Sequence, residues 1–208
     1  MRPFSEVSGI AAPMPQHNVD TDVIMPKQFL KGITREGLGS GVFYDLRYDG
    51  GGKPRPEFIL NRPAYANATF LVVGPNFGCG SSREHAVWGL LQLGIRALIG
   101  TTFASIFHDN CFKNGLLPVT LSCEQLDRLQ ARCASPEHSV LRVDLLGQVI
   151  VLDDDSRIGF HIDPLRRDDL LQGRDAIQTT LMSGAEITEF ERRHWAAWPW
   201  IKPHERPP

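Results

Sequence analysis

The chain has 208 residues, of which 42% are hydrophobic and 22% are charged. These fractions are typical of a folded globular protein and exclude a chain dominated by disorder. The formal net charge of −2 gives no reason to expect binding to nucleic acid or to an anionic membrane. No apolar run approaches the roughly 20 residues of a membrane-spanning helix, and the first residues lack the apolar stretch of a secretory signal. We therefore expect a cytoplasmic protein.

The chain has four cysteines, and their spacing predicts free thiols. None of them forms a C-x-x-C pair, and the spacing fits no zinc or ferredoxin pattern. In a reducing compartment such residues remain thiols, some of them as small core residues. We expect that this chain itself binds no metal or other cofactor. The cysteines are Cys79, Cys111, Cys123 and Cys133.

Along the first half of the chain, strands and helices are predicted to alternate. Residues 49–56 contain three glycines and two prolines, which predict an irregular loop. The apolar run 70–74 predicts a buried strand, a glycine-rich turn follows it, and a helix is expected over 82–93. A second strand is expected over 96–100. A second helix then begins near Phe103 and ends at Asn114-Gly115.

The second half begins in the same way and then changes its period. Residues 117–121 predict a third strand, and Ser122 with Gln125 forms a capping-box pattern that opens a helix. Alternating apolar residues then indicate antiparallel strands, and two helices follow. The strands fall within 140–151 and 157–162 and the helices over 164–172 and 185–195. The predicted fold class is α/β, a mixed sheet layered with helices.

The segment richest in chemical groups lies between the first predicted strand and its helix. Gly78 and Gly80 allow backbone conformations that other residues disfavour, and they let a ligand approach the main chain. Ser81 and Ser82 are expected at the helix start, where free N–H groups and the helix dipole attract anions. Arg83 adds a forked donor that suits a carboxylate. The segment therefore predicts a carboxylate-binding pocket.

Structural roles explain some of these residues individually. Ser81 and Glu84 have the spacing of a capping box, which requires only a stable helix start. His85 can be a buried structural histidine. Capping alone does not call for two glycines, two serines and an arginine together, so a binding function remains the better interpretation of the whole segment.

Two motifs in the chain resemble those of a known family. The run from Gly80 to His85 resembles the signature of the swivelling domain of the aconitase superfamily. The run from Asn18 to Leu30 looks like the N-terminal signature of bacterial isopropylmalate dehydratase small subunits. Segments 76–80, 105–107 and 114–118 are also similar, and the resemblance extends from about Phe4 to Glu191. It implies a swivelling β/β/α domain over residues 1–201, followed by a flexible tail over 202–208.

The resemblance implies a hydro-lyase subunit that isomerises 2-isopropylmalate and 3-isopropylmalate by dehydration and rehydration in leucine biosynthesis. It implies a heterodimer with a large subunit, on which a four-iron four-sulfur cluster acts as Lewis acid on the leaving hydroxyl. The substrate that the resemblance implies is a small dicarboxylate. By motif position, Ser81 matches the catalytic serine, whose alkoxide form takes the carbon-bound proton. Ser82 and Arg83 match residues that hold a substrate carboxylate, and Asp22 matches an aspartate that orients other groups, although it can also cap a turn.

The resemblance also implies that the segment 29–35 distinguishes substrates within the superfamily. Ile33 or Leu30 can contact the branched apolar group of the substrate. Arg35 and Lys31 can bind a carboxylate, although a solvated Lys31 fits equally well. The sequence departs from the common bacterial pattern at Glu36 and Leu38, where threonine and phenylalanine are usual. A related substrate such as citraconate or dimethylmalate therefore remains an alternative. An anion-binding module without catalysis is an alternative of a different class.

Overall fold

The computed structural model describes residues 1–31, 36–81 and 83–202. It divides into two compact units, Met1–Gly173 and a second unit that begins at Arg174. The expectation of one domain over 1–201 stays a prediction. Residues 203–208 of the predicted tail lie outside the described residues. Within the described part of the chain, no helix is long and apolar enough to cross a membrane.

The first unit is built on one seven-stranded mixed sheet, in the order β4-β3-β2-β1-β5-β6-β7. Neighbours among β1 to β4 pair in parallel, and β5 to β7 continue the sheet from β1 as antiparallel strands. This arrangement confirms the predicted mixed sheet and the antiparallel second half. The strands are β1 (Glu6–Met14), β2 (Ala68–Val73), β3 (Ala97–Gly100), β4 (Leu117–Thr120), β5 (Val140–Asp144), β6 (Val149–Val151) and β7 (Arg157–Gly159).

The central strand β1 is the one strand among these that the sequence pattern did not predict. The second half of β1 carries the small residues Ala11 and Ala12. Pro13 follows them and has no backbone N–H to donate to a neighbouring strand. Such a run has weak strand propensity. It is held by pairing on both sides, parallel to β2 and antiparallel to β5. A Cβ at Gly9 would collide with Thr69, so the two strands approach closely there.

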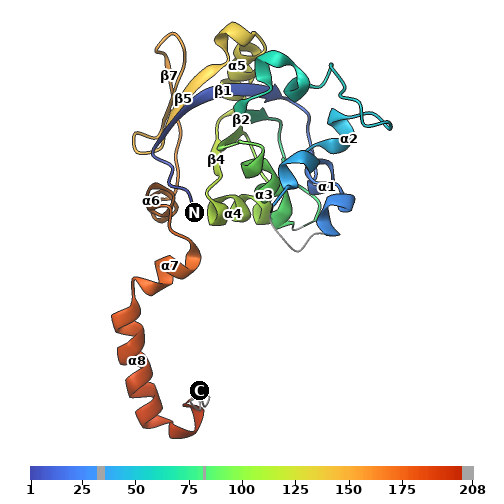
Figure 1. The fold of residues 1–208 in the computed structure, drawn as a ribbon. Coiled ribbons are helices and arrows are strands. Elements are labelled where there is room, and N and C mark those ends of the chain that lie inside the picture. Colours follow the sequence, from blue (N-terminus) through green and yellow to red (C-terminus); the bar gives the residue numbers. More distant parts are fainter. Residues whose placement is uncertain (32–35, 82, 203–208) are drawn as a thin grey trace. The chain divides into compact units, whose positions relative to one another are not determined.

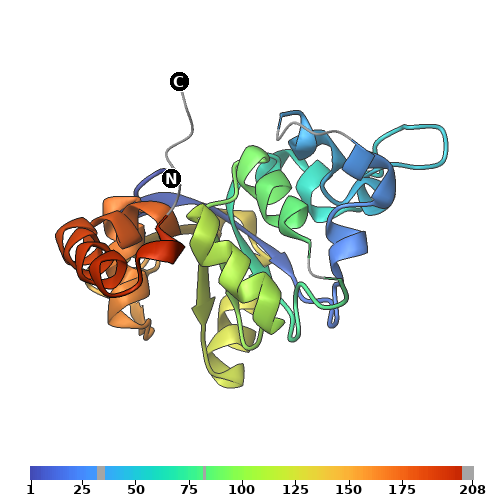
Figure 2. The same cartoon turned by 90° about the horizontal axis from the view of Figure 1, so that it is seen from below.

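The sheet is buried on both faces, as expected for parallel strands covered by helices. On β2, Leu71 and Val73 face one core cluster, whereas Phe70 and Val72 face the other. Helices α3 (Glu84–Gln92) and α4 (Ser105–Asn114) lie side by side over the first face (Figures 1 and 2). Helices α5 (Cys123–Cys133) and α6 (Pro164–Gln172) contribute side chains to the second cluster. The parallel strands are thereby fixed between two helical layers.

Several predicted helix ends are confirmed, and one is wrong. Gly115 ends α4 in the left-handed conformation at φ 83°. Ser122 and Gln125 form the predicted capping box at the start of α5. Helix α3 was expected to begin at Ser82, but it begins at Glu84 with Arg83 at the N-cap and without a side-chain cap. The proposed capping box of Ser81 and Glu84 is therefore not formed.

Short elements connect β1 to β2 and surround the predicted loop over 49–56. In this loop Asp49 Oδ1 accepts hydrogen bonds from the backbone N–H groups of Gly51 (2.8 Å) and Lys53 (2.9 Å). The loop is irregular, as its glycines and prolines predicted. The connecting helices are α1 (Thr21–Ile24), η1 (Lys27–Lys31), η2 (Leu38–Gly41), α2 (Tyr44–Arg47), η3 (Ile59–Asn61) and η4 (Pro63–Tyr65).

The second unit is helical. It contains α7 (Ala176–Leu181), α8 (Gly184–Ala197) and the short helix η6 (Pro199–Ile201). Helix α8 confirms the helix predicted over 185–195. Helix α7 was not predicted, although Asp175 and Gln178 form a capping box at its start. That box is the local signal for α7, and the helix behind it is too short to show a clear apolar period.

Candidate active site

The two motif segments leave neighbouring parallel strands at the same edge of the sheet and are joined by hydrogen bonds. The first follows β1 and the second follows β2. Gly78 N–H donates to the Val19 carbonyl (2.8 Å) and Thr21 N–H donates to the Cys79 carbonyl (2.9 Å). The Thr21 hydroxyl also donates to the Ser81 carbonyl (2.8 Å). The structure therefore brings together the two segments that the sequence had indicated separately.

The glycines of the second segment are required by its backbone path. Gly78 has φ +77° and Gly80 has φ +86°, a region that side chains with a Cβ rarely adopt. A Cβ at Gly78 would collide with the ring of Phe107 on α4. A Cβ at Gly80 would lie 3.2 Å from Asp20 Cβ, on the opposite segment. These glycines adopt the backbone conformations that the sequence predicted, and they allow the close contacts with Phe107 and Asp20. The predicted approach of a ligand stays a prediction.

Asp22 and Arg83 form an ion pair between Oδ1 and Nη1 across the two segments. The side chain of Arg83 is 21% exposed and that of Asp22 is 42% exposed, so the pair is open to solvent on one side. The cap of helix α1 is Asp20, whose Oδ1 accepts from Val23 N–H (2.7 Å). Asp22 therefore does not cap this helix, and its carboxylate pairs with the guanidinium of Arg83 instead.

Ser81 precedes Arg83 of this ion pair by two residues and is exposed. Thr21, which donates to its carbonyl, is buried. The Ser81 carbonyl accepts two hydrogen bonds, from the Thr21 hydroxyl and from Arg83 N–H (2.9 Å). Ser81 is therefore fixed by its main chain, and an exposed position leaves its hydroxyl accessible to a bound molecule.

The first turn of α3 is anchored to α4 by a polar network. Asn114 Nδ2 donates to Glu84 Oε1 (2.7 Å), and Trp88 Nε1 donates to Asn114 Oδ1 (2.9 Å). The His85 ring packs against the Trp88 ring with centroids 4.6 Å apart. Glu84 thus joins two helices, and His85 packs on a neighbouring ring of its own helix.

Four predicted site residues cannot be compared with this geometry. Ser82, Ile33 and Arg35 lie outside the described residues. Lys31 is the last residue of η1, and its side chain is likewise not described. Phe29 is the first residue of the segment 29–35, and its ring packs against that of Tyr44 with centroids 5.0 Å apart. The predicted roles of all four residues stay predictions.

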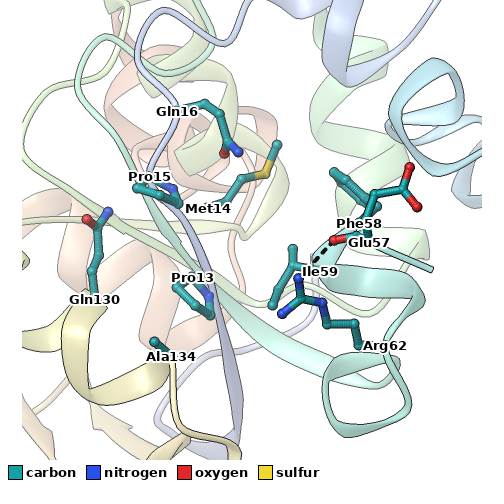
Figure 3. A pocket seen from close by; sticks show the side chains of 10 residues that line it. All are labelled: Pro13, Met14, Pro15, Gln16, Glu57, Phe58, Ile59, Arg62, Gln130 and Ala134. Atoms are coloured by element: carbon teal, nitrogen blue, oxygen red, sulfur yellow. Dashed lines mark hydrogen bonds between the residues drawn. The ribbon is translucent and has the colours of Figure 1, made fainter. Parts of the chain in front are cut away.

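A separate cavity of about 350 Å³ lies near the end of β1. Residues 13–16 lie between Gln130 and Ala134, at the end of α5, and residues 57–62 (Figure 3). Arg62 Nη2 donates to the Glu57 carbonyl (3.1 Å) within this lining. The cavity is lined by none of the predicted site residues. Its lining residues are Pro13, Met14, Pro15, Gln16, Glu57, Phe58, Ile59, Arg62, Gln130 and Ala134.

The cysteines and other potential metal ligands are dispersed. Among the described residues, no group of three or more histidine, cysteine, aspartate or glutamate side chains is arranged to hold an ion. All four cysteines are free thiols. Burial raises the pKa of the Cys133 thiol to about 12 and that of Cys111 well above its usual value, so both are inert core residues.

Comparisons with known proteins agree with this fold and these motifs. Residues 1–124 match the family model of the aconitase C-terminal domain. A crystal structure of 3-isopropylmalate dehydratase from Methanocaldococcus jannaschii has a similar fold, with a TM-score of 0.63 and 24% identity over 90% of this chain and 99% of that chain. The first unit thus contains an aconitase-type C-terminal domain, as the sequence resemblance implied.

Curated relatives narrow the assignment further. The chain is 52% identical to 3-isopropylmalate dehydratase small subunit 1 of Mannheimia succiniciproducens, over 97% of this chain and all of that protein. It is 54% identical to small subunit 2 of Salmonella typhimurium, over 97% of both chains. Residues 175–203 match the family model of the C-terminal domain of 3-isopropylmalate dehydratase small subunits. The chain therefore belongs to the family of 3-isopropylmalate dehydratase small subunits, which are subunits of a hydro-lyase in the aconitase superfamily.

Proposed function

We propose that this chain binds a large subunit and that the pair isomerises 2-isopropylmalate and 3-isopropylmalate. The observation that carries the proposal is the exposed Ser81 beside the Asp22–Arg83 ion pair. A solvent-open serine next to an oriented guanidinium suits a carboxylate substrate that a second protein covers. The family assignment supports the substrate class, and the geometry supports Ser81, Asp22 and Arg83 as the proposed groups that act on it.

Ser81 is the proposed base. Its Oγ takes the carbon-bound proton during dehydration and returns a proton to carbon during rehydration. Because serine is a very weak acid, the alkoxide must be stabilised by nearby positive charge and N–H donors. Arg83, two residues further on, carries the one guanidinium or ammonium side chain among the described residues of the segment 78–83. The four-iron four-sulfur cluster of the large subunit, when bound, supplies the Lewis acid for the leaving hydroxyl.

Arg83 is the proposed carboxylate ligand, together with Ser82. A guanidinium presents several N–H groups in a plane, so it can keep Asp22 on one side and bind a substrate carboxylate on another. Asp22 then acts as the orienting group that the family motif implies. Arg35, Lys31 and Ile33 complete the proposed substrate site from the segment that distinguishes related substrates.

The exposure of these groups supports a two-subunit enzyme. An alkoxide on the exposed Ser81 and the partly exposed Asp22–Arg83 pair gain less from electrostatics in water than they would in a covered site. We propose the large subunit as the cover and a heterodimer as the active species. A cytoplasmic location fits the four free thiols, and the net charge of −2 favours neither nucleic acid nor membrane.

The test is turnover of 2-isopropylmalate by the purified chain, with and without an anaerobically reconstituted large subunit. We expect activity only in the mixture. Activity of this chain alone would contradict the half-enzyme proposal. A mixture that ignores isopropylmalate but converts citraconate or dimethylmalate would keep the mechanism and change the substrate. Carboxylate binding without turnover of any substituted malate would favour the anion-binding module.

A further inference from the structure

The carbonyl of Ser81 accepts hydrogen bonds from both motif segments. It accepts one hydrogen bond from within its own segment, from Arg83 N–H (2.9 Å), and one from the opposite segment, from Thr21 Oγ1 (2.8 Å). A shift of this carbonyl would therefore move both Ser81 and the backbone of Arg83. The side chains of these two residues are the proposed base and the proposed carboxylate ligand.

The two contacts of Thr21 differ in what they demand of the residue. Its backbone N–H donates to the Cys79 carbonyl (2.9 Å), and any residue except proline supplies that donor. Only the hydroxyl reaches Ser81. Between Cys79 and Ser81 lies Gly80 at φ +86°, and a glycine adds little stiffness of its own. The position of Ser81 therefore depends on a side-chain contact, whereas that of Cys79 does not.

Thr21 itself is rigidly placed. It is 1% exposed, and its carbonyl accepts from Met25 N–H (2.9 Å) at the end of α1. The Asp20 side chain caps the same helix through Val23 N–H. A buried, backbone-fixed hydroxyl makes a precise hydrogen-bond donor, because little conformational freedom remains to be lost.

We propose that Thr21 is a positioning residue, whose hydroxyl fixes Ser81 and Arg83 in their working orientation through the Ser81 carbonyl. This inference rests on the proposed function for its catalytic consequence. Thr21 does not bind substrate in this scheme and acts only through Ser81 and Arg83. Because Asp22 still holds the Arg83 guanidinium when the Thr21 hydroxyl is lost, we expect the loss to lower kcat more than it raises KM.

The test compares Thr21→Val with Thr21→Ser. Valine keeps the shape and loses the hydroxyl, whereas serine keeps the hydroxyl and loses a methyl group. In the reconstituted complex we expect Thr21→Val to lower kcat about 10- to 100-fold, the scale of a small misplacement of reacting groups. We expect KM to change less than about 3-fold, and Thr21→Ser to keep kcat within the same small factor. Equal losses in both variants would overturn the positioning role.

Amide hydrogen exchange of the chain without its partner tests the same contact independently of catalysis. In Thr21→Val the Arg83 amide should exchange faster, because the Ser81 carbonyl that it donates to is held less firmly. The amide of residue 21, which donates to Cys79, should keep its protection and serves as the internal reference. Unchanged exchange at Arg83 would overturn the inference. If the Arg83 amide exchanges faster in Thr21→Val but the reconstituted wild-type complex shows no activity, the contact is supported and the proposed function is overturned.

Discussion

The ring of Phe107 on α4 lies directly against Gly78, and three of its carbon atoms lie within 2.7 Å of where a Cβ on Gly78 would stand. Phe107 is 2% exposed and also packs edge-on against Phe77, with ring centroids 5.7 Å apart. The segment that carries Ser81 thus packs against the core through Phe77 and Gly78. The shape of the candidate site depends on this support.

Gly78→Ala should therefore destabilise the chain. We expect a loss of about 2–5 kcal/mol in the free energy of unfolding, from the collision with Phe107 together with strain at φ +77°. Gly37→Ala is the matched control, because Gly37 has φ +79° and nothing lies within 4 Å of its Cβ position. Denaturant unfolding of both variants separates the two causes. Equal losses of unfolding free energy in the two variants would mean that the Phe107 ring moves aside without destabilising the fold.

Ser81→Ala should abolish most of the activity of the reconstituted complex. Removal of a general base lowers kcat by about 10²- to 10⁴-fold. The fold should be unaffected, because the hydrogen bonds that fix Ser81 are accepted by its carbonyl, which alanine retains. Ser8→Ala, on an exposed position of β1, is the control for serine loss. An active Ser81→Ala complex would assign the proton transfer to another residue.

Arg83→Gln should weaken substrate binding. Loss of a hydrogen bond to a charged group costs about 1.5–3 kcal/mol, so kcat/KM should fall roughly 10- to 150-fold. The kcat/KM of Arg83→Lys should lie between those of the wild type and Arg83→Gln. An ammonium keeps the charge but lacks the planar fork that can bind Asp22 and a substrate carboxylate together. Arg128→Gln removes a surface arginine paired with Glu124 on α5 and should leave kinetics unchanged. A Lys variant equal to wild type would mean that charge alone suffices.

His108 should titrate below its usual pKa of about 6.5. Burial and the neighbouring Arg166 guanidinium lower the pKa of His108, and Asp109 opposes this shift. The folded chain then binds fewer protons than the unfolded chain just below pH 6.5, so the contribution of His108 to stability rises with pH up to that value and falls in acid. NMR titration of the histidine ring measures the pKa directly.

Arg166→Gln separates the two causes of this shift. Its guanidinium lies 3.3 Å from His108 Nδ1, so its removal should raise the pKa of His108 part of the way toward 6.5, and burial should account for the remainder. Arg167→Gln, the next residue on α6, is the control for the loss of one positive charge. An unchanged titration in Arg166→Gln would assign the whole shift to burial.

Local signals in the sequence predicted much of the fold. The turn at Gly115, the capping box at Ser122 and the period change after residue 140 each depend on residues close together in the chain, and each is confirmed. The motif from Gly78 to Arg83 also indicated a carboxylate site, because glycines, serines and an arginine seldom gather for capping alone. The start of α3 was misplaced, since Ser81 and Glu84 satisfy the capping pattern without adopting its geometry.

By itself, the sequence determined the class of fold, the family and the segments that carry the chemistry, because these follow from short-range patterns and motifs. Only the tertiary structure decided how the segments meet. The pairing of Asp22 with Arg83, the contact of Thr21 with Ser81 and the support of Gly78 by Phe107 all join residues far apart in the chain. The third contact arises because α4 packs over the first face of the sheet, and the first two arise because β1 and β2 lie side by side in parallel and end at one edge. That adjacency is set by burial of the whole sheet, which no local pattern in β1 reveals.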